Sequence, residues 1–494
     1  MMWKKTIFIL IDSFMPHVFE EAEAQQKVPA LSFLKANGAY WNDCVTVFPT
    51  MSANIDASLM TGTYPDEHHV PGLVWYDRDE QRVVNYINGG KAVWRLGTRK
   101  CARDVLVSLN EQHLSRDVKT IFEEAARHHR TSASLNFSIH RGPVCYSVQK
   151  PGLMKLALLG TKFDSVTGPE PALLGRFFHS TGLRARFGQW NASVFKKYGL
   201  NDSFVIDMAI RLRKEGRLPA LTVIYMPDND YMYHRYPDKG VDILARADRQ
   251  IGRLLDSFGS WEEAVRQCRF IITGDHGQTK IGVEREALIA VLDSLIGMRV
   301  SCPEKVNPEQ DDLVICNNER MCFLYPLKEG VQEEVIKRLL GESRIDVLAW
   351  KDETGVRVGR GEQTLFFTRG GQVRDVYGAR WTVDGDLTLL DGSLAEKDGK
   401  QIVQFGQYPD AFSRLYGALY ARDGQVIVIT AQPGTEFYTP SDPTHQGGAS
   451  HGSLHHTDSL VPLIITGETK AAFAHPRLVD LKSYMLGCLH SGGY

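Results

Sequence analysis

The chain has 494 residues, of which 43% are hydrophobic, so it can form one large elaborated domain with an insertion, or two to three domains. Its 57 Lys and Arg side chains nearly balance 59 Asp and Glu side chains, and a formal net charge of -2 provides no electrostatic footprint for nucleic acid or an anionic membrane. The eight cysteines are scattered without CxxC spacing, which indicates reduced thiols in the cytoplasm and argues against a disulfide framework or a thiolate zinc site.

The first predicted element is the apolar run TIFILI, residues 6–11, which ends at Asp12. This run is too short for the hydrophobic region of a signal peptide or for a membrane span. It therefore predicts a first buried strand that is followed directly by a carboxylate.

Two hydroxyl residues, Thr50 and Ser52, come next, between a strand-like segment and a short helical pattern that ends at Gly62. Ser and Thr are ordinary residues at a helix start, where a side-chain oxygen accepts from the unpaired N–H groups of the first turn. A capping role and a nucleophilic role would need the same position, so this pattern alone leaves both open.

Short continuous apolar runs then alternate with helix-period segments along the chain. The runs are CVTVF, SASLNF, LTVIYM, FIIT, VIVIT and VPLIIT, and they are typical of strands buried on both faces. The segments between them repeat apolar residues at three- and four-residue spacing, as in VDILARADRQIGRLLDSF. This order predicts an α/β fold with a doubly wound, mostly parallel sheet.

Two stretches interrupt the alternation. Residues 141–200 are rich in Gly, Pro and aromatic residues and are expected to form surface excursions of the core. Residues 299–425 change to alternating strand patterns separated by Gly and Asp turns, which predicts an inserted α+β cap. The predicted core is then residues 1–298 and 426–494, with residues 299–425 as a lobe that governs substrate specificity.

Carboxylates follow three of the predicted core strands. They are Asp12, the pair Asp228 and Asp230, and Asp275 with its neighbour His276. Each alone is an ordinary turn or cap residue, but open α/β sheets bind ligands at the C-terminal edge, where all three would meet. Converging carboxylates repel one another and need a cation. Histidine with carboxylate and no thiolate favours Zn²⁺ or Mn²⁺ over Ca²⁺ or Mg²⁺.

A late segment contributes four histidines just before the run VPLIIT. They are His445, His451, His455 and His456. Such a density is typical of a metal site, but not all four can be ligands, and His445 is most simply interpreted as a solvated loop histidine.

Five ordered motifs carry a family resemblance: FILID, FPTMSANIDASLMTGTYPDEH, PDNDYMYH, GDHGQT and SHGSL. The set resembles the alkaline phosphatase superfamily, specifically its type I phosphodiesterase and nucleotide pyrophosphatase branch, from residue 6 to about residue 467. The resemblance implies two metal ions, usually zinc, and a Thr or Ser that attacks phosphorus and becomes covalently modified.

The resemblance also implies a role for individual residues. The family nucleophile precedes a T-G-x-Y-P segment by nine residues, and TGTYP here places Ser52, rather than Thr50, at that position. One metal group then has four members: Asp12, Ser52, Asp275 and His276. The other has three: Asp230, His234 and His451.

Three positions compete with this assignment. Asp228 rivals Asp230 but breaks the family spacing Asp-x-x-x-His, which Asp230 keeps with His234. His455 and His456 are the weaker competitors of His451, which matches the family's Ser-His-Gly signature.

One departure concerns substrate choice. Many nucleotide pyrophosphatases carry an Asn about 21 residues after the nucleophile that donates to a phosphate oxygen, and this chain has Leu73 there. Asn54, on the first turn after Ser52, is the candidate replacement donor. Without a donor, specificity for nucleotide diesters is in doubt.

The resulting prediction is a two-metal hydrolase of small phosphate esters, most simply of diesters or pyrophosphates. A phosphonate hydrolase or a phosphomonoesterase on the same fold is the alternative, and a decayed metal- or ligand-binding protein is a second. A sulfatase and a phosphomutase lack their signatures here, and an oxidoreductase lacks GxGxxG after the first strand.

Overall fold

The computed structural model describes residues 5–152, 154–161, 163–180, 183, 193–291, 295, 297–397, 399–439 and 442–490. Its core is an eight-stranded sheet with the strand order β2-β25-β11-β1-β10-β5-β8-β9. The strands are β2 (Gly38–Val45), β25 (Leu460–Thr466), β11 (Cys268–Gly274), β1 (Lys5–Ile11), β10 (Leu221–Met226), β5 (Ser132–Leu135), β8 (Ala172–Leu174) and β9 (Phe178–His179).

The middle of this sheet is parallel and its edges are antiparallel. Strand β1 pairs in parallel with β10 and β11, and the parallel pairing continues from β10 to β5 and β8. Strands β25, β2 and β9 are antiparallel to their neighbours. The predicted α/β fold with a mostly parallel sheet is confirmed.

Strand β1 shows why the apolar runs are continuous. Ile7, Ile9 and Ile11 belong to one buried cluster and Phe8 and Leu10 to another, because successive side chains of a strand point to opposite faces. The first cluster draws on α1 (Pro16–Ala24), α2 (Pro29–Ala36), α9 (Asp202–Lys214) and α11 (Gly240–Asp256). The second draws on α3 (Ser52–Thr61), α7 (Ile121–Arg127) and α17 (Leu481–His490). Helices therefore cover both faces.

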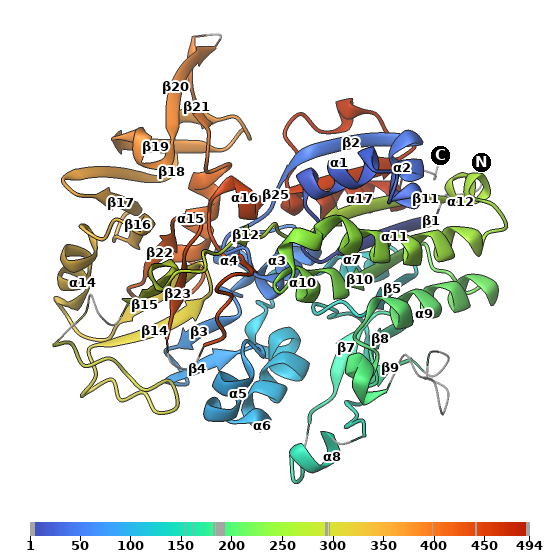
Figure 1. Ribbon diagram of the computed structural model, residues 1–494, viewed down its shortest axis with the longest axis horizontal. Helices are drawn as coiled ribbons and strands as arrows, with labels where there is room; N and C mark the ends of the chain where they lie inside the picture. The colour runs from blue at the N-terminus through green and yellow to red at the C-terminus, as the bar shows by residue number, and fades with distance from the viewer. Residues whose placement is uncertain are drawn as a thin grey trace.

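A second, largely antiparallel sheet lies beside the core sheet, at the left of Figure 1. Its order is β14-β15-β22-β16-β17-β18-β21-β20, with β19 paired to β18. The strands are β14 (Leu313–Asn318), β15 (Met321–Pro326), β16 (Ile345–Lys351), β17 (Val356–Arg360), β18 (Gln363–Asp375), β19 (Arg380–Gly385), β20 (Gly392–Lys397), β21 (Lys400–Phe405) and β22 (Ile427–Ala431). Helices α14 (Val331–Leu339) and α15 (Ala411–Leu419) accompany it.

Two expectations about individual segments need correction. Strand β22 was expected in the core sheet because of its buried apolar run, but it lies between β15 and β16 of the second sheet. An apolar run reports burial and not the identity of the neighbouring strands. In the stretch 141–200, β8 and β9 extend the core sheet rather than lying outside it, while residues 153, 162, 181–182 and 184–192 of that stretch are outside the described residues.

Both sheets contribute to one hydrophobic cluster. It contains Phe8 and Leu10 of β1 together with Val314 of β14 and Phe323 of β15, all buried. The second sheet therefore packs directly on the core. No helix among the described residues is both long enough and apolar enough to cross a membrane.

Candidate metal centre

Three adjacent strands of the core sheet deliver the predicted acidic residues. Asp12 directly follows β1, Asp275 and His276 directly follow β11, and Asp230 lies on α10 (Asp228–Tyr233), which begins just after β10. Since β11, β1 and β10 are neighbours and parallel, their C-terminal ends meet at one edge of the sheet. This placement brings residues that are far apart in the sequence to one site, as the sequence predicted.

Three of the four residues predicted for the first metal group, Asp12, Asp275 and His276, have candidate ligand atoms within 4.8 Å of one another, while the place of Ser52 in this group stays a prediction. His276 Nε2 lies 3.6 Å from both Asp12 Oδ1 and Asp275 Oδ2. All three atoms are buried and have no hydrogen-bond partner among the described residues. Buried polar atoms are normally paired, so three convergent unpaired ligand atoms fit a bound cation.

The electrostatics of Asp12 support the same conclusion. Burial and the nearby charges of Asp275 and Asp230 raise the pKa of the Asp12 carboxyl well above its usual value. The Tyr225 hydroxyl donates to Asp12 Oδ2 and partly offsets this effect. A divalent cation would favour the charged form of all three carboxylates. Tyr225 has no motif signal, because only the pairing of β1 with β10 places it beside Asp12.

The second metal group is built around Asp230. Its Oδ1 lies 3.3 Å from His234 Nε2 and 3.9 Å from His451 Nε2. The other ring nitrogen of each histidine donates to a backbone carbonyl: His234 Nδ1 to Ala449 at 2.7 Å and His451 Nδ1 to Thr50 at 2.6 Å. These bonds fix the tautomer that leaves Nε2 free to bind a metal, an arrangement typical of metal-binding histidines.

Without a cation, the second metal group holds a proton on His234. Burial disfavours the charged forms of both His234 and Asp230. The carboxylates of Asp230 and Glu319 nevertheless raise the pKa of His234 to about 10. The pKa of Asp230 is well below its usual value, because the charge and hydrogen bond of His234 and the nearby His451 outweigh burial. A metal has to displace the proton from His234, so metal binding releases a proton.

Two further residues connect the metal groups, and sequence reasoning missed both. The Ser13 hydroxyl donates to Asp230 Oδ1 at 2.7 Å, while its N–H donates to Asp275 Oδ1 at 2.9 Å. Gln278 Nε2 donates to the same Asp230 oxygen at 2.5 Å and to Ser13 Oγ at 2.9 Å. Ser13 has a φ of 54°, an unusual conformation for serine that turns the chain sharply after β1. The only sequence signal is that each lies within three residues of a predicted ligand.

Ser52 and Thr50 differ clearly in their surroundings. Thr50 is fully buried, and its hydroxyl accepts from Gly452 N at 2.7 Å and donates to Ser453 O at 3.2 Å. Ser52 is the first residue of α3, half-buried, and its hydroxyl has no hydrogen-bond partner among the described residues. The N-cap of α3 is Met51, without a side-chain cap, so neither hydroxyl caps this helix. Ser52 is thus free to react, and its nucleophilic role stays a prediction.

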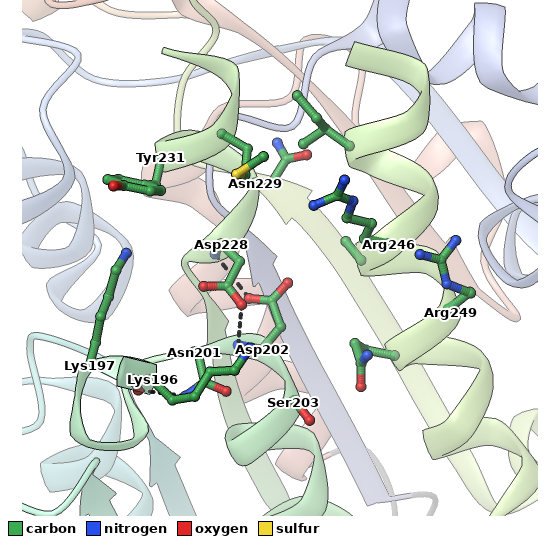
Figure 2. A pocket seen from close by; sticks show the side chains of 14 residues that line it. Lys196, Lys197, Asn201, Asp202, Ser203, Asp228, Asn229, Tyr231, Arg246 and Arg249 are labelled. Atoms are coloured by element: carbon green, nitrogen blue, oxygen red, sulfur yellow. Dashed lines mark hydrogen bonds between the residues drawn. The ribbon is translucent and has the colours of Figure 1, made fainter. Parts of the chain in front are cut away.

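The rival ligand Asp228 lies in a separate pocket between α9, α10 and α11 (Figure 2). Its Oδ2 accepts from Asp202 N at 3.1 Å, and its own N–H donates to Asp202 Oδ1 at 3.0 Å. His455 instead contacts Thr457, and the described clusters of candidate ligands include neither His455 nor His456. The geometry thus favours Asp230 and His451.

His445 is not a solvated loop histidine, which corrects the expectation from the sequence. Its side chain is only 14% exposed, its ring stacks on that of His234 with centroids 4.3 Å apart, and its Nδ1 lies 3.0 Å from Glu436 Oε2. Together with His234 and Glu319 it forms a further cluster of candidate ligand atoms within 4.8 Å. Loop position in the sequence did not reveal this burial, because two of the residues beside it, His234 and Glu319, are distant in the chain.

Asn54, the suggested replacement donor, is engaged with the backbone. Asn54 is fully buried and its amide donates to Pro49 O at 2.6 Å, which argues against a contact with substrate. At the aligned position, the N–H groups of Leu73 and Val74 donate to Asn318 Oδ1 at 3.0 and 2.9 Å.

The fold and the clustered carboxylates and histidines define an alkaline phosphatase-like protein. The chain belongs to the type I phosphodiesterase / nucleotide pyrophosphatase family, whose model matches residues 6–343, and the resemblance predicted from the motifs is confirmed. Members of this family are metal-dependent phosphoester hydrolases that typically bind two metals.

Solved structures agree in fold. Murine ectonucleotide pyrophosphatase/phosphodiesterase 5, in an inactive form in complex with AMP, matches with a TM-score of 0.55 and 13% identity over 98% of this chain and 95% of that chain. Phosphonoacetate hydrolase from Sinorhizobium meliloti, in complex with phosphonoacetate, matches with a TM-score of 0.56 and 17% identity over 98% and 96%. At these identities the likeness shows the fold alone. None of the curated proteins compared with the chain matches it significantly.

Proposed function

We propose that this protein is a two-metal hydrolase of small phosphate esters, acting on diesters or pyrophosphates, with Ser52 as the nucleophile. The observation that carries the proposal is the convergence of Asp12 Oδ1, Asp275 Oδ2 and His276 Nε2, three buried ligand atoms without partners, beside a second carboxylate–histidine group. Single carboxylate oxygens of ion pairs elsewhere, such as Asp66 and Asp410, are also unpaired, so it is the convergence of three such atoms that supports a bound cation.

The proposed ligands are those implied by the family motifs. Asp12, Ser52, Asp275 and His276 would hold one divalent ion, and Asp230, His234 and His451 the other. The nitrogen and oxygen donors favour zinc, with manganese as the alternative. When bound, the metal pair would supply Lewis-acid stabilisation of the attacking and leaving oxygens and lower the pKa of the Ser52 hydroxyl.

The position of Ser52 at the start of helix α3 supports this chemistry. It begins α3, a helix of ten residues, where unpaired N–H groups and the helix dipole favour an alkoxide and a phosphate. Ser52 Oγ would form a bond to phosphorus as the leaving oxygen departs with the electron pair of the broken ester bond. Water would then release the phosphoryl group from Ser52 and restore its hydroxyl.

Phosphonate hydrolysis is the second candidate. Leu73 replaces the Asn donor of many nucleotide pyrophosphatases, and Asn54 is engaged with Pro49, so an observation from the site itself weakens the case for nucleotide diesters. The same metal groups would support hydrolysis of a carbon–phosphorus bond. We also propose that the protein is cytoplasmic, because all eight cysteines are free thiols.

The proposal extends to the second sheet, where residues 299–425 would act as a specificity lobe over the site. Its hairpin β14–β15 contacts the Ser-His-Gly segment, since Arg320 N donates to His451 O at 2.9 Å. This contact supports a lobe that borders the metal centre.

One experiment tests the function. Purified protein is assayed with bis-p-nitrophenyl phosphate, p-nitrophenyl phosphate, a nucleotide 5′-phenylphosphonate ester and phosphonoacetate, before and after chelation and zinc return. We expect zinc-dependent turnover that is fastest with a diester. Turnover of phosphonoacetate alone would favour the second candidate. Absence of bound metal after zinc loading would overturn both and leave the decayed binding protein.

A further inference from the structure

Glu319 has an unusual backbone conformation and a buried carboxylate. It lies in the turn of the hairpin β14–β15, with φ at 62° and only 7% of its surface exposed. A side chain in the left-handed region is disfavoured, and glycine or asparagine would normally occupy such a turn. Strained residues of this kind concentrate at functional sites, so the Glu319 carboxylate is a candidate for a functional role.

The hairpin turn is fixed against the core at several points. Arg320, fully buried, donates to both oxygens of Asp458 at 2.6 Å, and its N–H donates to His451 O. Gly452 lies so close that a Cβ there would meet the backbone oxygen of Asn318 at 2.5 Å. The position of the Glu319 side chain is therefore set by the packing of the second sheet on the Ser-His-Gly segment.

The carboxylate of Glu319 faces the second metal group. Its Oε2 lies 3.6 Å from His451 Nε2 and accepts from Ser450 Oγ at 2.9 Å. Its ionic neighbours among the described residues are His445 and His451, without any Lys or Arg. The candidate ligand atoms of Glu319 and His234 lie within 4.8 Å of each other.

The separations resemble the edges of a metal coordination shell. His234 Nε2 to Asp230 Oδ1 is 3.3 Å, Asp230 Oδ1 to His451 Nε2 is 3.9 Å, and His451 Nε2 to Glu319 Oε2 is 3.6 Å. Ligands bound tetrahedrally at about 2.0–2.1 Å from zinc are roughly 3.3–3.4 Å apart. The four residues are divided between two neighbouring clusters of candidate ligand atoms, Asp230 and His451 in one and His234 and Glu319 in the other, so one ion would have to draw the two clusters together.

We propose that Glu319, supplied by the second sheet, is a fourth protein ligand of the metal held by Asp230, His234 and His451. The inference rests on the proposed function, because it presupposes the metal centre. It makes the hairpin β14–β15 part of the centre and joins the two sheets through the ion.

The charge of the centre agrees with this assignment. Asp12, Asp230, Asp275 and Glu319 are the carboxylates of the candidate-ligand clusters among the described residues, and their four negative charges would balance two divalent ions while Ser52 keeps its proton. With Glu319 bound, this ion has four protein ligands, and a substrate oxygen would bind by displacing Glu319 or by raising the coordination number.

The test compares Glu319→Gln and Glu319→Gly with Glu436→Gln. Glu436 is also buried and contacts His445, but it is outside the clusters of candidate ligands. Metal-free proteins are titrated with zinc against a chromogenic chelator, and bound zinc is counted by mass spectrometry. We expect two ions in the wild type, and a loss of affinity on the order of 100-fold or more for one of them in both Glu319 variants. Glu436→Gln should retain both affinities.

Glu319→Gly guards against simple misfolding. Glycine accepts a φ of 62° without strain, which offsets the loss of the carboxylate's contacts with Ser450 and His445, so the metal-free Glu319→Gly protein should melt cooperatively near the wild-type temperature. A wild type that binds no zinc would overturn the proposed function and this inference together. Two wild-type ions with unchanged affinities in both Glu319 variants would overturn the inference alone. An anomalous zinc peak more than about 3 Å from the Glu319 carboxylate oxygens would also overturn the inference alone.

Discussion

At the scale of single residues, the two hydroxyls Thr50 and Ser52 have separate tasks. Thr50 holds the loop that carries His451, through its hydroxyl to Gly452 N and its carbonyl to His451 Nδ1. Ser52 keeps a hydroxyl without a partner at the start of α3. Thr50 therefore positions the predicted ligand His451, and Ser52 stays the predicted nucleophile.

Replacing these hydroxyls should have opposite effects. Ser52→Ala removes the proposed nucleophile and should lower kcat on the order of 10³-fold or more with little change in melting temperature, whereas Ser52→Thr should retain activity. Thr50→Ala leaves a buried N–H of Gly452 unpaired and should cost about 1–3 kcal/mol of unfolding free energy, with activity retained at low temperature. Steady-state rates with one aryl phosphodiester and denaturant unfolding give both quantities. Full activity in Ser52→Ala would show that the register is wrong.

His140 gives a stability effect remote from the metal groups. It is fully buried, with Asn110 Nδ2 donating to its Nε2 and its Nδ1 donating to Thr167 O at 2.8 Å, so it is held neutral. Burial lowers its pKa from 6.5 to about 4. Because the unfolded state then binds the proton more readily, this stability is complete above pH 6.5 and is lost as the pH falls through about 4.

The expected loss from His140 is about 3 kcal/mol of unfolding free energy. The wild type and His140→Gln are unfolded with urea in excess chelator at several pH values. The difference between them isolates the contribution of His140, since the predicted metal ligands titrate alike in the two proteins. The wild type should lose more stability than the variant toward low pH. Parallel curves would contradict the assignment of a neutral buried His140.

At the scale of elements, the hairpin β14–β15 and the Ser-His-Gly segment fit together through Gly452. Its φ is 119°, and a Cβ there would come within 2.5 Å of Asn318 O and 3.2 Å of Arg320 N. Backbone atoms cannot move aside as flexible side chains can. This glycine therefore allows the hairpin turn to reach the metal centre.

Gly452→Ala should separate the hairpin from the centre. The matched control is Gly447→Ala, at a φ of 75° where a Cβ would meet only Val283 at 3.4 Å, so that strain is present without the backbone clash. Gly452→Ala should cost about 1–3 kcal/mol beyond the control and weaken zinc binding. Thermal melting and zinc titration of the two variants provide the comparison. Equal melting temperatures and zinc affinities in Gly452→Ala and Gly447→Ala would show that the close approach of Gly452 to the hairpin is unimportant.

At the scale of the whole molecule, one hydrophobic cluster spans the core sheet and the second sheet. One face of the second sheet has a separate buried cluster around Leu324 and Val335, but its other face shares a cluster with the core sheet, in which Phe8 of β1 and Phe323 of β15 both take part. The two sheets should therefore unfold together.

Calorimetry should show a single unfolding transition in metal-free protein. Zinc at about 1,000 times its Kd should raise the unfolding free energy by about 4 kcal/mol, because the ion binds only the folded state. Two separate transitions, with only one shifted by zinc, would instead establish residues 299–425 as an independent lobe.

The sequence by itself determined the fold class and the family, and it predicted the residues that the structure gathers in the candidate metal groups. Continuous apolar runs such as residues 6–11 predict buried parallel strands, and carboxylates that follow such strands must meet at one sheet edge. Local order and spacing carry this information, since strand ends and motif intervals are properties of adjacent residues. Asp12, Asp275 and His276 were predictable for that reason.

Only the tertiary structure decided what comes from a distance to surround those residues. The position of β22 depends on which strands pair with it, and the stacking of His445 on His234 and the approach of Glu319 to Ser450 join residues that are more than a hundred positions apart. Tyr225 reaches Asp12 only through strand pairing. No local pattern encodes such contacts, because they arise from packing between elements whose relative positions the whole chain sets.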